Sequence, residues 1–145
     1  MKRRNILVIY SCRYKFNVKA TYRGYKESSW TVNGKNNRNH YVIAVECVNT
    51  SEVASFDFWM SIAKPRMKEP YDIGNAFYSF VNDALCGLMS IDEFFSEFGY
   101  ELPSEAIKVH DACKKALDGL TRLLGVDEND DILYDLVNDL SEQYG

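Results

Sequence analysis

The chain of 145 residues has few of the side chains from which enzymes usually build a reactive centre. It contains two histidines, His40 and His110, and no Gly-rich phosphate loop, G-x-S-x-G motif or H-E-x-x-H motif. The remaining residues suggest no set of nucleophile, base and orienting group. The sequence therefore predicts a protein that is not an enzyme and that needs no cofactor.

The four cysteines, Cys12, Cys47, Cys86 and Cys113, form no C-x-x-C pair. They fall in different predicted elements, which is typical of free thiols in a reducing compartment. A zinc site made by His110, Cys113 and Cys86 is conceivable, because the first two share a helix face. Metal-ligand spacing is otherwise absent, so we expect buried cysteines and no metal.

No segment reaches the roughly 18 apolar residues that a membrane-spanning helix needs. The N-terminal sequence MKRRNILVIYSC has a charged start and a short apolar run. It lacks a small-residue cleavage site, and the run is shorter than a typical signal core. We interpret it as a first strand and expect a cytoplasmic protein without a membrane partner.

The formal net charge of −4 conceals an uneven distribution along the chain. Residues 1–69 contain thirteen basic and five acidic side chains, whereas residues 70–145 contain four basic and sixteen acidic ones. This asymmetry predicts either a charged partner or two halves of the protein that face each other.

The first half alternates apolar and polar residues as β-strands do. In residues 14–23 the alternation is strict, and the expected inner face consists of Tyr14, Phe16, Val18, Ala20 and Tyr22. Residues 5–12 form a nearly continuous apolar run, which predicts a central, well-covered strand. Arg13 lies between the two runs and indicates a tight hairpin. Further strands are expected at residues 30–32, 40–48 and 54–61.

The most apolar stretch, residues 71–100, joins the two halves. Apolar side chains recur there at steps of three and four, which predicts a helix with a wide buried face. Gly87 and Ser90 are expected to stop this helix, because Ser90 and Glu93 match an S-x-x-E capping box. A second, short helix should then start at Ile91.

Two more helices are expected after this stretch. The first has Ser104 as its N-cap and ends at Gly125. The last follows a cap at Asp127 or Asn129 and reaches Gln143. Its expected inner face consists of Ile132, Leu133, Leu136, Val137 and Leu140.

Together these elements predict a single α+β domain over residues 1–145. Its first part, residues 1–62, should form an antiparallel sheet of four or five strands in meander order. Its second part, residues 71–145, should supply about four helices. Helices packed on one face of the sheet form the economical two-layer arrangement.

The last helix carries a row of carboxylates on its expected outer face. Such a row can imitate the phosphates of DNA and occupy the basic groove of a nuclease, although a solvated helix face is its commoner meaning. The residues that we expect to contact a partner protein are Asp127, Glu128, Asp131, Asp135, Asp139 and Glu142.

The basic face of residues 14–23 is the alternative binding surface. Lys15 and Lys19 are four residues apart, which corresponds to about 13 Å along a strand. These cations could follow a phosphate backbone while nearby Tyr and Trp rings stack on bases, whereas the simpler interpretation is a solvated sheet face. The candidate nucleic-acid ligands are Lys15, Lys19, Arg23, Lys26, Lys35 and Arg38.

A third possibility is that the acidic helices partly neutralise the basic sheet. This contact would form either within one molecule or across a homodimer. No proline blunts the expected sheet edge, and an open edge favours dimerisation by strand pairing.

Two segments, FDFWMSIAKP (residues 56–65) and NDALCGLMSIDEFFSEFGYE (residues 82–101), resemble small, uncharacterised proteins of bacteriophages and mobile elements. In those proteins a similar aromatic strand precedes an EFGY-type corner and a Lys-rich helix similar to KVHDACKKALDGL. The likeness covers about half of the chain, and the longer acidic C-terminal helix departs from it. The resemblance implies a phage setting and transfers no catalytic residue.

Small, acidic, non-enzymatic phage proteins often act against host defences such as CRISPR or restriction, which is an association and not a mechanism. The resemblance therefore implies a phage-encoded inhibitor or accessory protein in the host bacterial cytoplasm. Its expected partner is a host nuclease or CRISPR effector, bound through charged surfaces. A nucleic-acid-binding module is the alternative.

Overall fold

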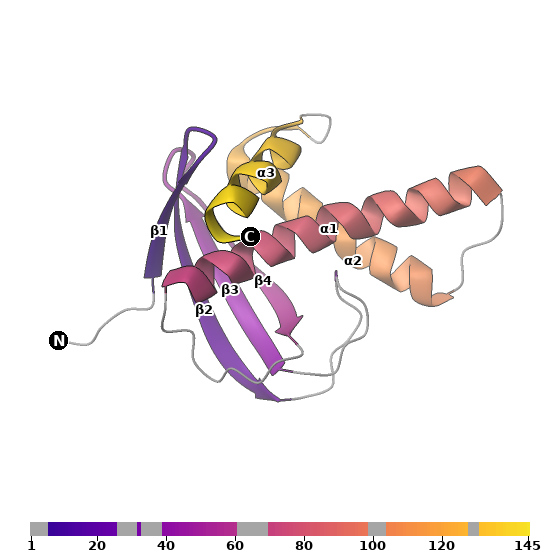
Figure 1. Cartoon of the computed structure of the whole chain (residues 1–145), viewed down its shortest axis with the longest axis horizontal. Helices are drawn as coiled ribbons and strands as arrows, with labels where there is room; N and C mark the ends of the chain where they lie inside the picture. Colours follow the sequence, from indigo (N-terminus) through magenta and orange to yellow (C-terminus); the bar gives the residue numbers. More distant parts are fainter. Residues whose placement is uncertain (1–5, 26–31, 33–38, 61–69, 99–103, 128–130) are drawn as a thin grey trace.

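The computed structural model describes residues 6–25, 32, 39–60, 70–98, 104–127 and 131–145. Four strands precede three helices in the described chain (Figure 1). The strands are β1 (Ile6–Ser11), β2 (Tyr14–Tyr25), β3 (Asn39–Cys47) and β4 (Glu52–Met60). The helices are α1 (Pro70–Phe98), α2 (Ser104–Leu124) and α3 (Ile132–Tyr144).

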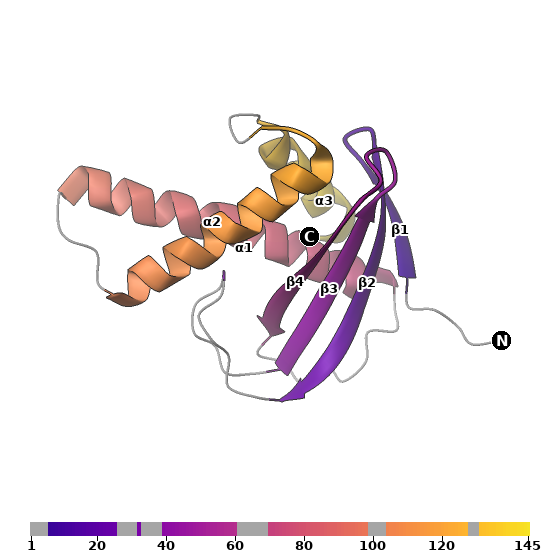
Figure 2. The same ribbon diagram turned by 180° about the vertical axis from the view of Figure 1, so that it is seen from behind.

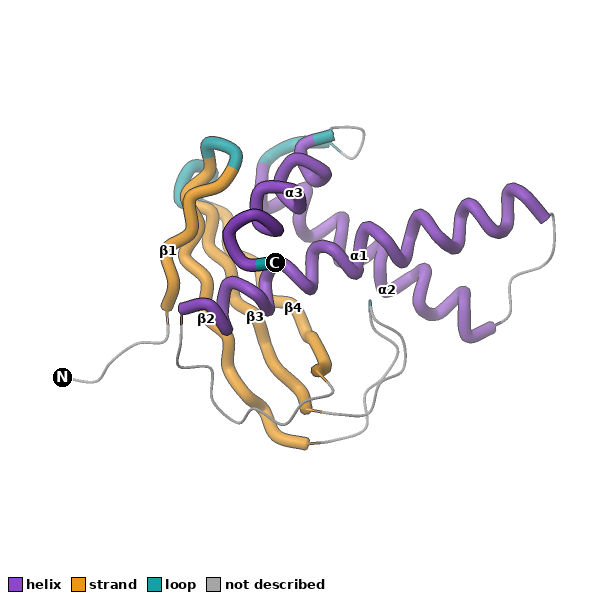
Figure 3. Tube along the Cα trace, in the orientation of Figure 1, coloured by secondary structure: helices purple, strands orange, loops and turns teal. Residues whose placement is uncertain are grey.

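The four strands form one antiparallel sheet in the order β1-β2-β3-β4, and the helices pack on one of its faces (Figure 3). The predicted α+β class and meander order are therefore confirmed. Cys12 and Arg13 form the predicted tight hairpin between β1 and β2. Both have positive φ angles, 52° and 72°, as expected for a two-residue turn that follows the twist of its strands.

The core lies between the sheet and the helices, and aromatic rings join the two layers. The ring of Phe77 on α1 meets the ring of Phe16 on β2 edge-on, with centroids 5.7 Å apart. The ring of Phe80, one turn further along α1, packs on the ring of Phe56 on β4, with centroids 4.6 Å apart. The inner face of the sheet is buried and contains Phe16, Val18, Ala20, Tyr41, Ile43, Val45, Phe56 and Phe58.

The predicted break in the central stretch is wrong, because α1 is one continuous helix of 29 residues. Gly87 lies inside it, where a Cβ would approach the Sγ of Cys113 on α2 to 2.7 Å. The glycine therefore permits close packing of α1 on α2 and does not end the helix. The expected corner at Ser90 is absent, so the described chain has three helices and not about four.

Despite the length of α1, none of the described helices is long and apolar enough to cross a bilayer.

The interpretation of residues 5–12 as a central strand is also wrong. Their strand, β1, lies at one edge of the sheet because the meander order places the first strand there. The side chains of Ile6, Val8 and Tyr10 on its outer face are 46%, 44% and 66% exposed. The apolar run thus covers the core with only one of its faces.

The observed ends of the last two helices agree in part with those predicted from the sequence. α2 ends at Leu124, directly before Gly125, whose φ of 72° is typical of a helix end. The residue at the N-cap of α3 is Asp131, and not Asp127 or Asn129, and its carbonyl oxygen accepts the first backbone hydrogen bond of the helix. Asn129 lies outside the described residues, as does most of the strand expected at residues 30–32.

The C-terminal end of α3 is held against the start of α1. Asn75 Nδ2 on α1 donates a hydrogen bond of 2.8 Å to the carbonyl oxygen of Tyr144. The Tyr144 ring lies directly against Gly74, where an added Cβ would overlap with it. This contact fixes how α3 is presented beside the sheet.

The packing of Tyr144 on Gly74 predicts the sign of a substitution effect. An interior Gly→Ala change normally stabilises a helix by about 1 kcal/mol. Here Gly74→Ala should instead lower the free energy of unfolding by about 1–3 kcal/mol, because the new methyl group displaces the ring. Urea denaturation, followed by circular dichroism, measures the change.

Combining Gly74→Ala with Tyr144→Ala provides the control. In the absence of the ring, the alanine should regain its usual stabilising effect, and the two sites should therefore be strongly coupled. Equal effects of Gly74→Ala in both backgrounds would show that the contact does not position α3.

Candidate functional site

Polar contacts hold α3 against the end of β1. Ser11 Oγ donates a hydrogen bond of 2.6 Å to Asp139 Oδ2. Gln143 Nε2 donates to the same carboxylate oxygen, at 3.1 Å, and to the carbonyl oxygen of Tyr10, at 3.0 Å. Asp139 is therefore half-buried and occupied within the fold, which separates it from the other predicted partner-binding carboxylates.

The remaining carboxylates of α3 face solvent. Asp131, Asp135 and Glu142 are exposed, and their side chains have no hydrogen-bond or ion-pair partner within the described chain. Residues 131 and 142 are about 16 Å apart along the helix axis, at 1.5 Å per residue. Asp127 is exposed just before this helix, and Glu128 lies outside the described residues.

The predicted basic surface is present on the outer face of β2. Lys19 and Arg23 are exposed there, and Lys15 is half-buried with its Nζ 5.9 Å from the centre of the Tyr10 ring. The neighbouring Glu46 on β3 accepts a hydrogen bond from Asn17 Nδ2 at 2.9 Å, so the face is not uniformly positive. Lys26, Lys35 and Arg38 lie outside the described residues.

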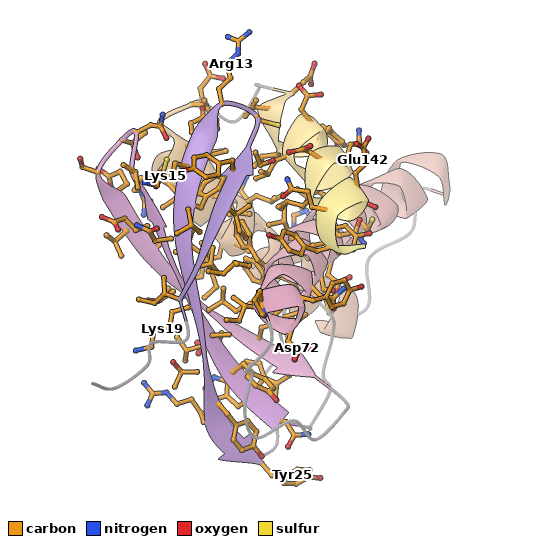
Figure 4. All side chains as sticks on the ribbon, turned by 60° about the vertical axis from the view of Figure 1, so that its left-hand side comes forward. Arg13, Lys15, Lys19, Tyr25, Asp72 and Glu142 are labelled. Atoms are coloured by element: carbon orange, nitrogen blue, oxygen red, sulfur yellow. The ribbon has the colours of Figure 1, made fainter. Side chains whose placement is uncertain are left out.

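The edge of the sheet at β1 separates the two charged surfaces. Figure 4 shows Lys15 and Lys19 on one side of this edge and Asp72 and Glu142 on the other. Among the residues that the structure describes, no ion pair joins Lys15, Lys19 or Arg23 to a carboxylate. The two surfaces therefore do not neutralise each other by contact in this part of the chain.

A hollow of about 420 Å³ lies where the surfaces meet, at the tip of the β1–β2 hairpin. Arg13 and Lys15 line it together with Asp139. Cys12 also lines it, and burial, together with smaller effects of the charges of Asp139 and Asp135, raises the pKa of its thiol against the opposing effect of Ser11. The thiol is therefore a poor nucleophile, since the thiolate is the reactive form.

The other cysteines are also free thiols. Cys113 is buried between α2 and α1, and its Sγ lies 3.7 Å from the carbonyl oxygen of Val32. Burial, with a smaller effect from Asp83, raises the pKa of this thiol to about 11. Cys86 is exposed and Cys47 is buried.

No metal centre forms from the described side chains: no three His, Cys, Asp or Glu residues converge. Cys86 is exposed and its Sγ lies 3.6 Å from Asn82 Oδ1, one turn earlier on α1. His110 Nδ1 lies 3.8 Å from Asp111. The zinc arrangement considered from the sequence is therefore not assembled here.

The sequence did not identify a histidine–carboxylate pair on the outer face of the sheet. His40 Nε2 lies 2.8 Å from Asp57 Oδ1, and the His40 ring stacks on Trp59 with centroids 4.3 Å apart. The pairing register of β3 and β4 places Trp59 opposite His40 and could have revealed this cluster. The other ring nitrogen, Nδ1, is buried and has no hydrogen-bond partner among the residues that the structure describes.

Comparisons with protein-family models, curated proteins and solved structures found no match to this chain.

Asp83 on α1 gives the protein a predictable pH dependence. Burial raises the pKa of this half-buried carboxyl from 3.8 to about 6. Between these values the folded state binds more protons than the unfolded state, so Asp83 lowers the stability as the pH rises, and its full cost is present above pH 6. Asp83→Asn should therefore stabilise the protein at neutral pH but not below pH 3.8, where the carboxyl is protonated in both the folded and the unfolded state.

Urea denaturation of both proteins over this pH range measures the effect. The stability difference between Asp83→Asn and the wild type should grow with pH and then become constant. The exposed Asp118→Asn on α2 is the matched control and should show a much smaller change. A difference for Asp83→Asn that does not depend on pH would contradict the raised pKa of this carboxyl.

Proposed function

We propose that this protein is a non-catalytic inhibitor or accessory protein that binds a nucleic-acid-handling protein complex. Its binding surface is the exposed acidic face of α3, which consists of Asp131, Asp135 and Glu142, with Asp127 just before the helix. These carboxylates take the place of nucleic-acid phosphates in the partner's basic groove. The phage setting implied by the sequence resemblance makes a host nuclease or CRISPR effector the expected target.

The observation that carries this proposal is the availability of the three α3 carboxylates on a firmly placed helix. The side chains of Asp131, Asp135 and Glu142 have no partner in the described part of the protein. Hydrogen bonds at both Asp139 and Tyr144 fix α3 against the sheet and α1. A fixed helix presents its charges without a large loss of conformational entropy on binding, which favours affinity.

Exchange of two α3 carboxylates for lysines tests the proposal. Asp135→Lys/Glu142→Lys should weaken retention of partner proteins by about tenfold or more, because attraction to a basic groove becomes repulsion. The protein is immobilised, a bacterial lysate is passed over it, and bound proteins are displaced with short duplex DNA. The lysate proteins that DNA displaces from the immobilised wild type should be nucleic-acid-handling proteins. The immobilised variant should not retain them.

Glu52→Lys/Asp118→Lys is the matched control, because it gives the same net charge with both substitutions at exposed positions away from α3. The control should retain the same proteins as the wild type. Equal retention by the α3 variant and the wild type would refute the acidic surface. Asp139 is left unchanged because its substitution would also remove the hydrogen bond to Ser11.

The row of cations on β2 supports a second candidate function, that of a nucleic-acid-binding module. Lys15, Lys19 and Arg23 share one face of the strand, and none of them forms an ion pair within the described residues. Three contacts with single-stranded phosphates should give a slope of about −2 when the logarithm of the binding constant is plotted against that of the salt concentration.

Fluorescence anisotropy with a labelled single-stranded oligonucleotide measures this slope. If the module is the function, Lys15→Gln/Lys19→Gln should reduce the slope towards about −1, and Lys114→Gln/Lys115→Gln on α2 should leave it unchanged. Absence of binding at low salt would exclude this candidate and leave the acidic surface of α3.

A further inference from the structure

The second edge of the sheet, at β4, has a row of unpaired backbone groups. Val48 N donates to Lys15 O, and Lys15 N donates to the Asn49 side chain, so both backbone groups of Lys15 point towards β3. Because backbone groups of successive strand residues point to alternate sides, this observation sets the pattern across the whole sheet. The registers of β2 with β3 and of β3 with β4 carry this pattern to the edge strand. The N–H and C=O groups of Val53, Ser55 and Asp57 therefore point away from β3.

These outward groups have no hydrogen-bond partner among the residues that the structure describes. Val53, Ser55 and Asp57 span four residue steps, or about 13 Å of strand. Their side chains point to the outer face of the sheet, and all three residues are exposed. An edge of this kind is a ready template for an additional strand.

Helix α2 lies beside this edge (Figure 2). It forms the second wall of a groove whose lining includes residues of β4 and α2. The groove has a volume of about 900 Å³, at the upper end of the range for ordinary ligand sites. Thr50 Oγ1 donates a hydrogen bond of 2.7 Å to Leu123 O and so fixes the end of α2 next to the β3–β4 turn. The Phe56 ring lies against Gly119, which joins the strand to the helix at the floor.

The floor of the groove is apolar, whereas its helical wall is charged. Phe56 and Phe80 lie at the floor, with the small side chains Ala112 and Ala116 on α2. Lys108, Asp111, Lys115, Asp118 and Arg122 supply the charges of the helical wall.

The helical wall is locally positive between residues 115 and 122, where Lys115 and Arg122 flank one carboxylate, Asp118. None of these three side chains has a partner among the described residues. Elsewhere in the lining the charges of Lys108 and Asp111 are opposite, and Asp57 is hydrogen-bonded to His40.

We propose that the groove between β4 and α2 binds an extended, acidic segment of a partner protein, which adds to the sheet as a fifth strand beside β4. Backbone hydrogen bonds to Val53, Ser55 and Asp57 supply affinity that does not depend on the segment's sequence. Alternate side chains of the segment, opposite Ala54 and Phe56, enter the groove and contact its apolar floor. Carboxylates near the two ends of the segment pair with Lys115 and Arg122.

The dimensions of the groove agree with this occupant. Lys115 and Arg122 are seven residues apart on α2, or about 10 Å along its axis. An extended chain covers this distance in about three residues, so both cations can be reached by a segment that also spans the free edge. A strand with acidic residues around two apolar side chains therefore matches the backbone, the floor and the charges together.

Selection from a displayed library of random peptides of about seven residues provides the probe, a length that covers the free edge of β4. Enriched peptides should combine acidic residues with alternating apolar ones. A synthetic copy of the best binder, titrated into isotope-labelled protein, should shift the amide resonances of Val53, Ser55, Asp57 and the facing side of α2. No enrichment, or shifts confined to β1 or α3, would overturn the proposal.

Proline substitution tests the strand addition itself. Ser55→Pro removes an outward N–H while leaving the β3–β4 hydrogen bonds in place, as proline does on edge strands. It should weaken binding of the selected peptide by about tenfold or more, and isothermal titration calorimetry measures the affinity. The matched control is Val8→Pro, which changes an outward N–H on the opposite edge, β1, and should leave the affinity unchanged.

Charge reversal on α2 tests the acidic character of the segment and does not rely on the folding of the proline variant. Lys115→Glu/Arg122→Glu should weaken binding of the selected peptide by about tenfold or more. Lys114→Glu, an exposed neighbour that does not line the groove, should have a much smaller effect. Unchanged affinity in the double variant would refute the acidic peptide.

Sedimentation of the protein without peptide distinguishes another occupant of the edge. The proposal requires that Ser55→Pro and the wild type sediment alike at all concentrations. A dimer that Ser55→Pro dissociates would assign the β4 edge to a second copy of the chain and overturn the proposal. These measurements do not involve the carboxylates of α3, so they succeed or fail independently of the proposed acidic surface.

Discussion

Burial of the inner face of the sheet beneath α1 determines the positions of the other elements. Phe77 and Phe80 on this helix contact Phe16 and Phe56 on different strands. α1 also packs against both other helices and against β1. Because a sheet with one apolar face requires a cover, α1 occupies that face and leaves α2 and α3 to pack on either side of it. The two sheet edges therefore acquire different neighbours: α3 at β1 and α2 at β4.

Local periodicity predicted the elements whose faces are decided by their own residues. The alternation in residues 14–23 and the apolar face of α3 were confirmed, since a period of two or of 3.6 places side chains without reference to the rest of the chain. Apart from the N-cap of α3, the errors concerned non-local contacts. The role of Gly87 depends on Cys113, which is distant in sequence, and the exposure of β1 depends on the order of the strands. Neither relation is visible in a sequence window.

The candidate surfaces show the same limit. The sequence identified the carboxylates of the last helix, but only the packing of α3 on β1 shows that Asp139 is hydrogen-bonded to Ser11 while Asp135 and Glu142 remain available. The His40–Asp57 pair follows from the register of β3 against β4. From the sequence we predicted no role for Lys115 and Arg122, because the role proposed for them depends on an edge strand more than fifty residues earlier in the sequence.

The two sheet edges are unequal as binding surfaces. At β1, Gln143 already occupies the carbonyl oxygen of Tyr10, and the exposed side chains next to the edge are apolar. At β4 an added strand would meet unpaired backbone groups and also a helical wall that can select side chains. Specific recognition needs both components, since backbone pairing alone does not distinguish sequences. The four-stranded sheet separates the two edges by about 14 Å, at 4.7–4.9 Å per strand, so one partner can engage the groove and the acidic face of α3 without competition between them.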